Sequence, residues 1–422
     1  MHPERFSLFS IIFITLGILL DIYVLFNWQK FVKKYGYSTW WYKSTWIFAC
    51  IVLAGSIYSS SLLLYYIGET SGIYLFQMLA FLWYLPKILI ALVLLVKDGV
   101  RVVLFVSSKL NFLVRTLFKR TIISENSDSL HQPISARRDF MQKVAWTTAG
   151  APFLIAANGM FRTAFDFETY RHNLPIKGLP SQLEGLRIVQ ISDIHSGSFA
   201  SSKPMQEVRY IIESLRPDII LITGDFVNFL PDELKITFPE LRKLTAPLGV
   251  FASIGNHDHY MSNDNHQLLL KVIKDAGINV LINDNSIIDI DGSKLNIAGI
   301  DNTGLGQNFG NINVALNGLD VSNPTILLAH DPTFWDNEIR CKVPSVDVML
   351  SGHTHGGQVG VHLLGEDLSF ARMVYKQWAG MYKDNDQILY VNRGLGMVGP
   401  PIRIAIEPEI TLFTLTRTEY LG

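Results

Sequence analysis

Long apolar segments in the first 160 residues set the strongest limit on how this chain can fold. A bilayer core about 30 Å thick needs roughly 20 apolar residues in one helix, because backbone amides find no water there. Three segments have this length and composition: residues 6–26, 45–67 and 73–96. A fourth, residues 144–161, is shorter and contains Pro152. The sequence therefore predicts an all-α membrane domain over residues 1–161, with about four transmembrane helices.

The charges of the connections predict an orientation. Residues 27–44 contain four Lys and no acid, and residues 97–143 contain nine Lys or Arg against four acids, whereas residues 68–72 carry only Glu69. Because basic loops stay in the cytoplasm, we expect residues 97–143 to be a basic cytoplasmic loop. Four spans then place the C-terminal part outside the cytoplasm. If residues 144–161 lie on the surface instead of crossing, that part faces the cytoplasm.

Three features of the membrane region allow more than one interpretation. Residues 100–119 are helical in pattern but interrupted by basic side chains, which predicts an interfacial helix. Arg137 and Arg138 precede the fourth segment and resemble either an internal twin-arginine export signal or ordinary flanking charge. Asp21 and Lys87 lie within apolar segments, where charge is rare, and serve either a function or a structural role.

Residues from about 162 onward have the mixture of polar and apolar residues that is typical of a soluble domain. β-Branched runs at 187–192, 218–223 and 249–254 alternate with helical patterns at 203–215 and 231–244. This alternation predicts an α/β layer architecture. We place a linker at residues 162–185 and the soluble domain at residues 186–422.

Composition excludes one class of partner and one kind of cross-link. The formal net charge is -1, and the soluble part has no basic stripe with interleaved aromatic residues, so we expect no nucleic-acid partner. Cys50 and Cys341 are the only cysteines, and Cys50 lies in an apolar run. No disulfide can therefore form within the soluble domain.

Side chains suited to binding metal follow five of the β-branched runs. Because the carboxyl ends of such strands meet at one edge of a sheet, we expect these side chains to converge and to bind two adjacent divalent metal ions. A shared carboxylate usually holds two such cations, which suits Asp225. Mixed nitrogen and oxygen ligands favour Mn, Fe or Zn. The residues are Asp193, His195, Asp225, Asn256, His257, Asp258, His330, His353 and His355.

In sequence order, the strings D-I-H, G-D, G-N-H-D, a His before Asp-Pro, and G-H-T-H-G-G-Q resemble the motifs of the calcineurin-like metallophosphoesterases. The resemblance covers residues 186–415 and is greatest for the YkuE-like, membrane-attached branch. It implies a two-sheet β sandwich flanked by helices, an α/β (α+β) fold, with a dinuclear centre. It also implies a ligand set for each metal: Asp193, His195, Asp225 and His355 for the first, and Asp225, Asn256, His330 and His353 for the second.

The same resemblance implies roles for two further residues. His257 would protonate the departing oxygen or stabilise charge on the phosphoryl group, and Asp258 would fix the tautomer of His257. Two metals can bring the pKa of a bridging water near neutrality, so a bridging hydroxide would be the nucleophile. Gly255 and Gly352 let the backbone approach the centre closely.

These observations predict an integral, multi-pass membrane enzyme of a bacterial cell membrane that hydrolyses a phosphate ester or pyrophosphate bond. Its membrane attachment favours a lipid-linked substrate over a small phosphorylated molecule. The alternative is a cell-envelope sensor or scaffold that binds a phosphorylated ligand through a metal-containing domain.

Some residues outside the motifs also have two interpretations. The aromatic and Met-rich residues 370–381 either pack in the core or form an apolar lip beside the site. Arg393 either contacts substrate phosphate or supports a turn through a salt bridge. His172, His259, His266 and His362 have no motif support, and we expect them to be surface or supporting residues.

Overall fold

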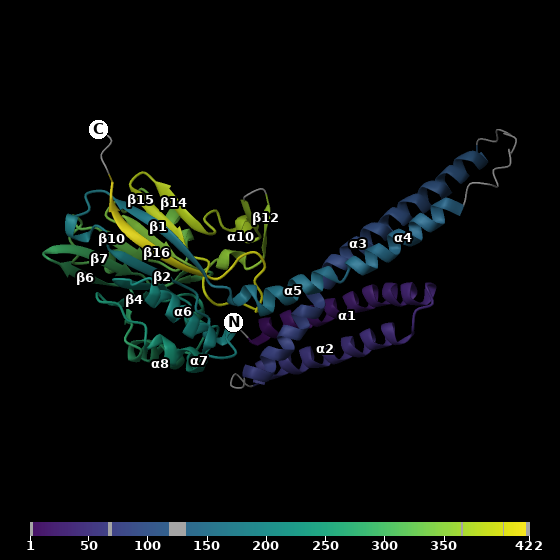
Figure 1. Ribbon diagram of the computed structural model, residues 1–422, viewed down its shortest axis with the longest axis horizontal. Helices are drawn as coiled ribbons and strands as arrows, with labels where there is room; N and C mark the ends of the chain where they lie inside the picture. The colour runs from purple at the N-terminus through teal and green to yellow at the C-terminus, as the bar shows by residue number, and fades with distance from the viewer. Residues whose placement is uncertain (1–2, 66–69, 118–131, 364–365, 400, 419–422) are drawn as a thin grey trace. The chain divides into compact units, whose positions relative to one another are not determined.

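The computed structural model describes residues 3–65, 70–117, 132–363, 366–399 and 401–418 (Figure 1). The chain forms two compact units, Met1–Ala157 and Asn158–Gly422. The predicted boundary at residue 161 lies close to this division. Each unit has its own architecture and is described separately.

The first unit is helical. Large apolar side chains on these helices are exposed, among them Leu16, Leu92 and Phe105, as expected of surfaces that face lipid. Within the described residues, Ile11–Lys34 and Met78–Val114 are long and apolar enough to cross a bilayer. Residues 66–67 of the predicted second span lie outside the described residues. The helices are α1 (Pro3–Lys34), α2 (Trp40–Tyr65), α3 (Thr70–Leu117), α4 (Gln132–Thr148) and α5 (Ala151–Phe161).

Two segments of this unit differ from expectation. Residues 100–117 are not a separate interfacial helix, because α3 continues unbroken to Leu117. The described residues of 97–143 are helical, since 97–117 belong to α3 and 132–143 to α4. Turn residues 149–150 separate α4 from α5, so residues 144–161 are not one continuous helix, and their crossing of the bilayer stays a prediction. Isolated basic side chains do not end a helix, because their long stems leave the backbone hydrogen bonds intact.

The two charges within apolar segments pair with each other. The ammonium of Lys87 on α3 donates to the carboxylate of Asp21 on α1. Asp21 also accepts hydrogen bonds from Trp83 Nε1 and from the Tyr84 hydroxyl, both at 3.2 Å. Asp21 and Lys87 are buried, and the ion pair joins α1 to α3. These contacts favour a structural role for the pair.

The second unit contains two six-stranded sheets. In the first, β2, β3, β4 and β5 are parallel, β16 is antiparallel to β2, and β1 is parallel to β16. Its order is β1 (Glu168–Ile176), β16 (Glu409–Arg417), β2 (Arg187–Ile191), β3 (Ile219–Thr223), β4 (Val250–Ser253) and β5 (Asn279–Val280).

The second sheet has a parallel centre and antiparallel edges. Strands β7, β10, β11 and β15 are parallel, while β14 and β6 pair antiparallel at the edges. Its order is β14 (Gly380–Asp384), β15 (Gln387–Val391), β11 (Val348–Ser351), β10 (Thr325–Leu328), β7 (Ser293–Gly299) and β6 (Asp284–Ile290).

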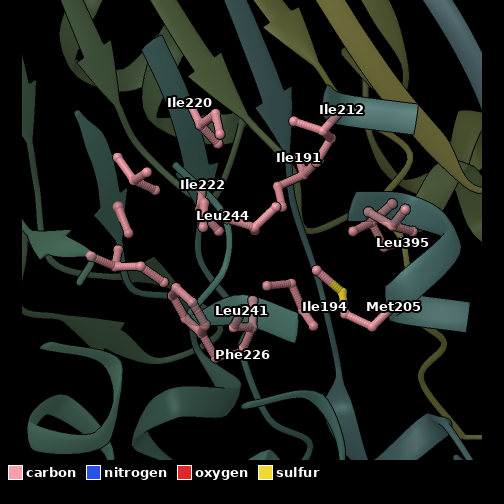
Figure 2. Packing of buried hydrophobic residues seen from close by; sticks show 14 of the residues in the cluster. Ile191, Ile194, Met205, Ile212, Ile220, Ile222, Phe226, Leu241, Leu244 and Leu395 are labelled. Carbon is pink, nitrogen blue, oxygen red and sulfur yellow. The ribbon is translucent and has the colours of Figure 1, made fainter. Parts of the chain in front are cut away.

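Alternate residues of the strands build the core on both faces of the first sheet. Ile188, Ile219 and Leu221 pack against side chains of the second sheet, such as Ile326 and Leu350. The opposite face is covered by α6 (Lys203–Ser214), α7 (Leu234–Leu241) and α8 (Asn263–Asp275). Figure 2 shows Ile191, Ile220 and Ile222 in this layer, with Met205 and Ile212 of α6 and Leu241 of α7. Burying each such side chain contributes about 1.5–3 kcal/mol.

This arrangement confirms the predicted α/β fold, a two-sheet sandwich flanked by helices. One segment differs from expectation. Residues 162–185, predicted to be a linker, contain β1, which forms an edge of the first sheet and contributes Leu174 and Ile176 to the core. An edge strand is less buried than a central strand, and β1 buries two of its nine residues, so it lacks the β-branched run that marks the central strands.

Candidate metal centre

The predicted ligands gather where strands of both sheets end. Asp193 and His195 follow β2, Asp225 follows β3 and Asn256 follows β4 in the first sheet. In the second sheet His330 follows β10, and His353 and His355 follow β11. All seven residues are buried or nearly so. Parallel strands deliver their carboxyl ends to one edge, which explains the convergence of residues that lie far apart in sequence.

Asp193, His195 and His355 form the first cluster. Nε2 of His355 lies 3.2 Å from Oδ1 of Asp193 and 3.1 Å from Nε2 of His195. Candidate ligand atoms of the three residues all lie within 4.8 Å of one another. These are three of the four residues expected around the first metal.

Asp225, His330 and His353 form the second cluster, again with ligand atoms within 4.8 Å of one another. Oδ2 of Asp225 lies 3.0 Å from Nε2 of His330 and 3.5 Å from Nε2 of His195 in the first cluster. Asp225 therefore lies between the two clusters, in the place expected of a shared carboxylate.

Several polar atoms of these clusters have no hydrogen-bond partner within the described part of the chain. Oδ1 of Asn256 and Nε2 of His330 are both buried without a bond, although Nε2 of His330 is close to Asp225. An unsatisfied buried group costs about 1–3 kcal/mol. Nδ1 of His330 lies 2.6 Å from the carbonyl oxygen of Thr223, which can only accept. In the neutral imidazole of His330 the lone pair is therefore on Nε2, as in a metal ligand. The donor set fits divalent cations.

Electrostatics couple Asp225 and His330. Burial opposes ionisation of Asp225, yet His330 and His257 hold the pKa of this carboxyl well below its usual range. Burial likewise disfavours the charged form of His330. The attraction of the Asp225 carboxylate is stronger than this effect and raises the pKa of the imidazole to about 10. Because metal ligation requires the neutral imidazole, binding of a cation here displaces a proton.

The loops that carry the ligands are conformationally strained. Five of the seven predicted ligands have positive φ, between 42° and 71°. For residues with a β-carbon this conformation costs about 1–3 kcal/mol each, and it is concentrated at functional sites. Sharp left-handed turns direct consecutive loop side chains into one small volume. The five are Asp193, His195, Asp225, His353 and His355.

Two glycines allow the backbone to approach the clusters. A β-carbon on Gly255 would lie 2.2 Å from Oδ1 of Asp225. One on Gly352 would lie 1.9 Å from Oγ of Ser192 and 2.2 Å from Oδ2 of Asp193. Neither contact is physically possible, so only glycine fits with the ligands in these positions.

His257 lies beside the clusters. Its backbone N–H donates to Oδ1 of Asp225 at 2.8 Å, and its ring centroid is 4.7 Å from that of His195. Nδ1 lies 2.8 Å from the carbonyl oxygen of Asn228. Burial lowers the pKa of His257 to about 4, so the free site holds a neutral imidazole.

The structure corrects the role expected of Asp258. Its carboxylate does not hold the Nδ1 atom of His257. Instead it accepts hydrogen bonds from the backbone N–H groups of Gly255, Asp225 and Phe226, at 2.9–3.0 Å. Burial, with the charge of Asp225, raises the pKa of Asp258 to about 7. Asp258 therefore ties together the loops after β3 and β4, and the Asn228 carbonyl sets the tautomer of His257.

One buried carboxylate near the site was missed in the sequence. Glu233 accepts hydrogen bonds from the backbone N–H groups of Asn228, Phe229 and Leu230, at 2.6, 2.9 and 3.1 Å. It thereby holds the loop whose carbonyl binds His257. The sequence does contain a signal for this role. Pro231 begins a helical turn, and Glu233 stands three residues after Leu230, which is the spacing of a capping glutamate.

Tyrosine hydroxyls line the two clusters. The Tyr375 hydroxyl lies 3.0 Å from Nε2 of His353, and the amide of Asn256 donates to the Tyr260 hydroxyl at 2.9 Å. Arg393 pairs with the buried Glu409 at 2.8 Å, which agrees with its interpretation as a structural salt bridge. His259 pairs with Asp301 at 2.7 Å, which suits a supporting residue.

Comparison with protein families agrees with this geometry. Residues 186–357 match the family described as calcineurin-like phosphoesterase. Residues 4–164 match a second family, described as probable calcineurin-like phosphoesterase, transmembrane domain. The first match lies within the second unit of the structure, and the second match covers the first unit from residue 4 onward and ends at residue 164.

Individual proteins similar to this chain are named as metallophosphoesterases or phosphodiesterases. The uncharacterized metallophosphoesterase YkuE of Bacillus subtilis is 34% identical over 60% of this chain and 86% of YkuE. Phosphodiesterase YaeI of Escherichia coli is 28% identical over 59% of this chain and 88% of YaeI. The transmembrane protein with metallophosphoesterase domain of Danio rerio is 28% identical over 62% of this chain, which spans 60% of the zebrafish protein. The chain belongs to the calcineurin-like phosphoesterases, a family of metal-dependent hydrolases, and carries a transmembrane domain before its catalytic unit.

Proposed function

We propose that the protein is a membrane-anchored phosphoesterase that holds two divalent cations, Mn, Fe or Zn. Asp193, His195, Asp225 and His355 would bind the first cation. Asp225, Asn256, His330 and His353 would bind the second. The position of Asp225 between the two clusters, within 3.5 Å of a ring nitrogen from each, is the observation that carries this proposal.

Such a pair of cations would supply a nucleophilic hydroxide at neutral pH and would offset negative charge on the phosphoryl group. The protein side chains supply position and a proton. Nδ1 of His257 is held by Asn228, so proton exchange takes place at Nε2. An anionic phosphoryl group nearby raises the proton affinity of this ring. The protonated Nε2 then donates to the oxygen that leaves phosphorus, and the ring returns to its neutral form.

We propose a phosphate ester or pyrophosphate as the substrate, with an apolar, lipid-linked leaving group. Phe229 and Phe309 are half exposed. The ring centroid of Phe229 lies 6.1 Å from that of His257, and the ring centroid of Phe309 lies 4.7 Å from that of His259. Exposed aromatic rings beside a phosphate site suit a substrate with an apolar part. The transmembrane domain supports the same choice, because it keeps the catalytic unit in a lipid environment.

The hydrolase proposal is tested with the full chain in detergent, loaded with Mn²⁺ and supplied with bis-p-nitrophenyl phosphate. We expect turnover that EDTA abolishes and that added Mn²⁺ restores. The Asp225→Asn variant should show none, because one carboxylate is shared by both cations. Fully metallated protein without turnover would favour the alternative of a metal-containing sensor or scaffold.

We further propose that the catalytic unit lies outside the cytoplasm. The basic connections support this orientation if residues 144–161 cross the bilayer. Cys341 is exposed on the catalytic unit and can be labelled after a Cys50→Ser change. In intact cells an impermeant maleimide should label Cys341 but not a cysteine placed at Ser127. Labelling of both from the same side would contradict this orientation.

A further inference from the structure

A group of exposed apolar side chains projects from the segment that follows the last metal-ligand loop. It lies on β12 (Gly360–Leu363), β13 (Glu366–Ser369) and α10 (Ala371–Val374). We call this group the apolar tip. Phe370, Met373 and Val374 are the most exposed, with 71%, 83% and 76% of their surface accessible. Its members are Val361, Leu363, Leu368, Phe370, Met373 and Val374.

The apolar tip is built on ordered structure. Strands β12 and β13 pair antiparallel, with Val361 opposite Leu368. The Ser369 hydroxyl donates to the carbonyl oxygen of Gly356 at 2.5 Å and accepts from the N–H of Ala371 at 3.2 Å. The tip thus holds an exposed apolar surface in place, although exposure of adjacent large apolar side chains to water is unfavourable.

The same segment connects the tip to the candidate metal centre. Gly356 directly follows the predicted ligand His355. The carbonyl oxygen of Gly356 accepts the hydrogen bond from the Ser369 hydroxyl. Tyr375, next to Val374, reaches Nε2 of His353 at 3.0 Å. A surface that receives the tip therefore lies close to the metal centre.

The chemistry of the tip matches a lipid surface. The segment carries Glu366, Asp367, Arg372 and Lys376, and Lys376 pairs with Asp336 at 2.9 Å, so its charges favour neither sign of headgroup. The apolar side chains carry the match, because exposed aromatic and aliphatic groups are typical of interfacial membrane contacts, where they enter the acyl boundary. The transmembrane domain tethers the catalytic unit to a bilayer, which supplies a lipid surface for the tip.

We propose that the apolar tip inserts into the surface of the bilayer and so places the metal centre at the membrane interface. The importance of this contact for catalysis rests on the proposed function. The insertion itself is independent of turnover and is measured without substrate.

The test uses the full chain in nanodiscs of phosphatidylcholine and phosphatidylglycerol. Cys50 and Cys341 are replaced by Ser, and a spin label is attached through Met373→Cys. The matched control is Val321→Cys, because Val321 is also an exposed apolar residue of the catalytic unit, at 73%, but lies far from the tip in sequence. Accessibility of each label to oxygen, which concentrates in lipid, and to a water-soluble nickel chelate is then compared.

We expect the oxygen-to-nickel accessibility ratio to be several-fold higher at position 373 than at position 321. Nanodiscs of phosphatidylcholine alone should give the same ratio at position 373, because apolar side chains make the contact. Equal ratios at the two positions would overturn the proposal. Shielding of position 373 from both reagents would also overturn it, since a protein partner would then cover the tip. Hydrolysis of bis-p-nitrophenyl phosphate by the same samples reports separately on the proposed function.

Discussion

The backbone carbonyl oxygen of Asn228 lies 2.8 Å from Nδ1 of His257. A carbonyl can only accept, so Nδ1 carries the proton and the lone pair of the neutral ring is on Nε2. In many catalytic histidines a carboxylate fills this role. A neutral carbonyl orients the ring without adding negative charge, so burial can keep the pKa of His257 low.

Replacement of His257 should separate catalysis from metal binding. We expect His257→Ala to lower kcat by about 10²–10⁴-fold, the usual contribution of a positioned acid. Elemental analysis should show the same metal content as in the unmodified protein, because His257 is outside the proposed ligand set. The control is His362→Ala, which changes an exposed histidine. Loss of metal in His257→Ala would mean that His257 is a ligand.

Removal of the Glu233 carboxylate should disturb His257 from a distance. In Glu233→Ala three backbone N–H groups lose their acceptor, and the loop that carries the Asn228 carbonyl is no longer held. We expect kcat to fall about tenfold, equivalent to about 1.4 kcal/mol of transition-state stabilisation, with KM and metal content unchanged.

The adjacent residue provides a control for Glu233. Asp232 is exposed and pairs with Lys235 at the surface, so Asp232→Ala should leave kcat unchanged. Because Glu233 positions His257, the pH profile of kcat should also change in Glu233→Ala. An unaltered profile with a lower melting temperature would point to a purely structural role.

A methyl group at position 352 should displace a ligand. In Gly352→Ala the new β-carbon collides with Ser192 and with the carboxylate of Asp193. We expect metal content, measured by elemental analysis, to fall in this variant. Gly178→Ala is the control, because its β-carbon would meet open space and only backbone strain is added. Full metal occupancy in Gly352→Ala would show that Asp193 is not needed as a ligand.

The stability of the catalytic unit should depend on the ionisation of Asp347. Burial raises the pKa of this carboxyl from 3.8 to about 6. The folded protein therefore holds the proton more tightly than the unfolded chain. The associated stability is fully present below about pH 4 and is lost as the pH rises through about 6.

Asp347→Asn should remove this dependence. The amide can still accept from the N–H of Thr325, which donates to Asp347 at 2.8 Å. At pH 8 we expect the variant to be more stable than the unmodified protein by up to ~3 kcal/mol, since one pKa unit corresponds to about 1.4 kcal/mol. Melting temperatures between pH 4 and 8 measure the effect. Parallel curves for the two proteins would contradict it.

The sequence predicted the central strands and the converging ligands because both have strong residue-type signals. Central parallel strands such as β3 are continuous β-branched runs, and a polar residue directly after such a run marks the ligand edge. Strand β1 has no such run, because it lies at an edge and buries two of its nine residues. The unbroken α3 was missed because basic side chains within a helix resemble an end.

The fine structure of the site was less predictable for a physical reason. The partner of His257 is a backbone carbonyl, which every residue has, so no residue type at position 228 signals it. Asp258 follows His257 directly in sequence, and adjacency suggested contact between the side chains. The structure instead directs the Asp258 carboxylate toward three backbone N–H groups. Only the tertiary fold decides between these partners.

The most direct test of the proposed centre is its metal stoichiometry. The full chain is loaded with Mn²⁺, freed of excess metal, and measured by elemental analysis beside Asp225→Asn. We predict two metal ions per chain in the unmodified protein and a loss of bound metal in the variant, because the Asp225 carboxylate lies between both clusters. Metal content that is the same in both proteins would contradict the shared-ligand centre on which the account depends.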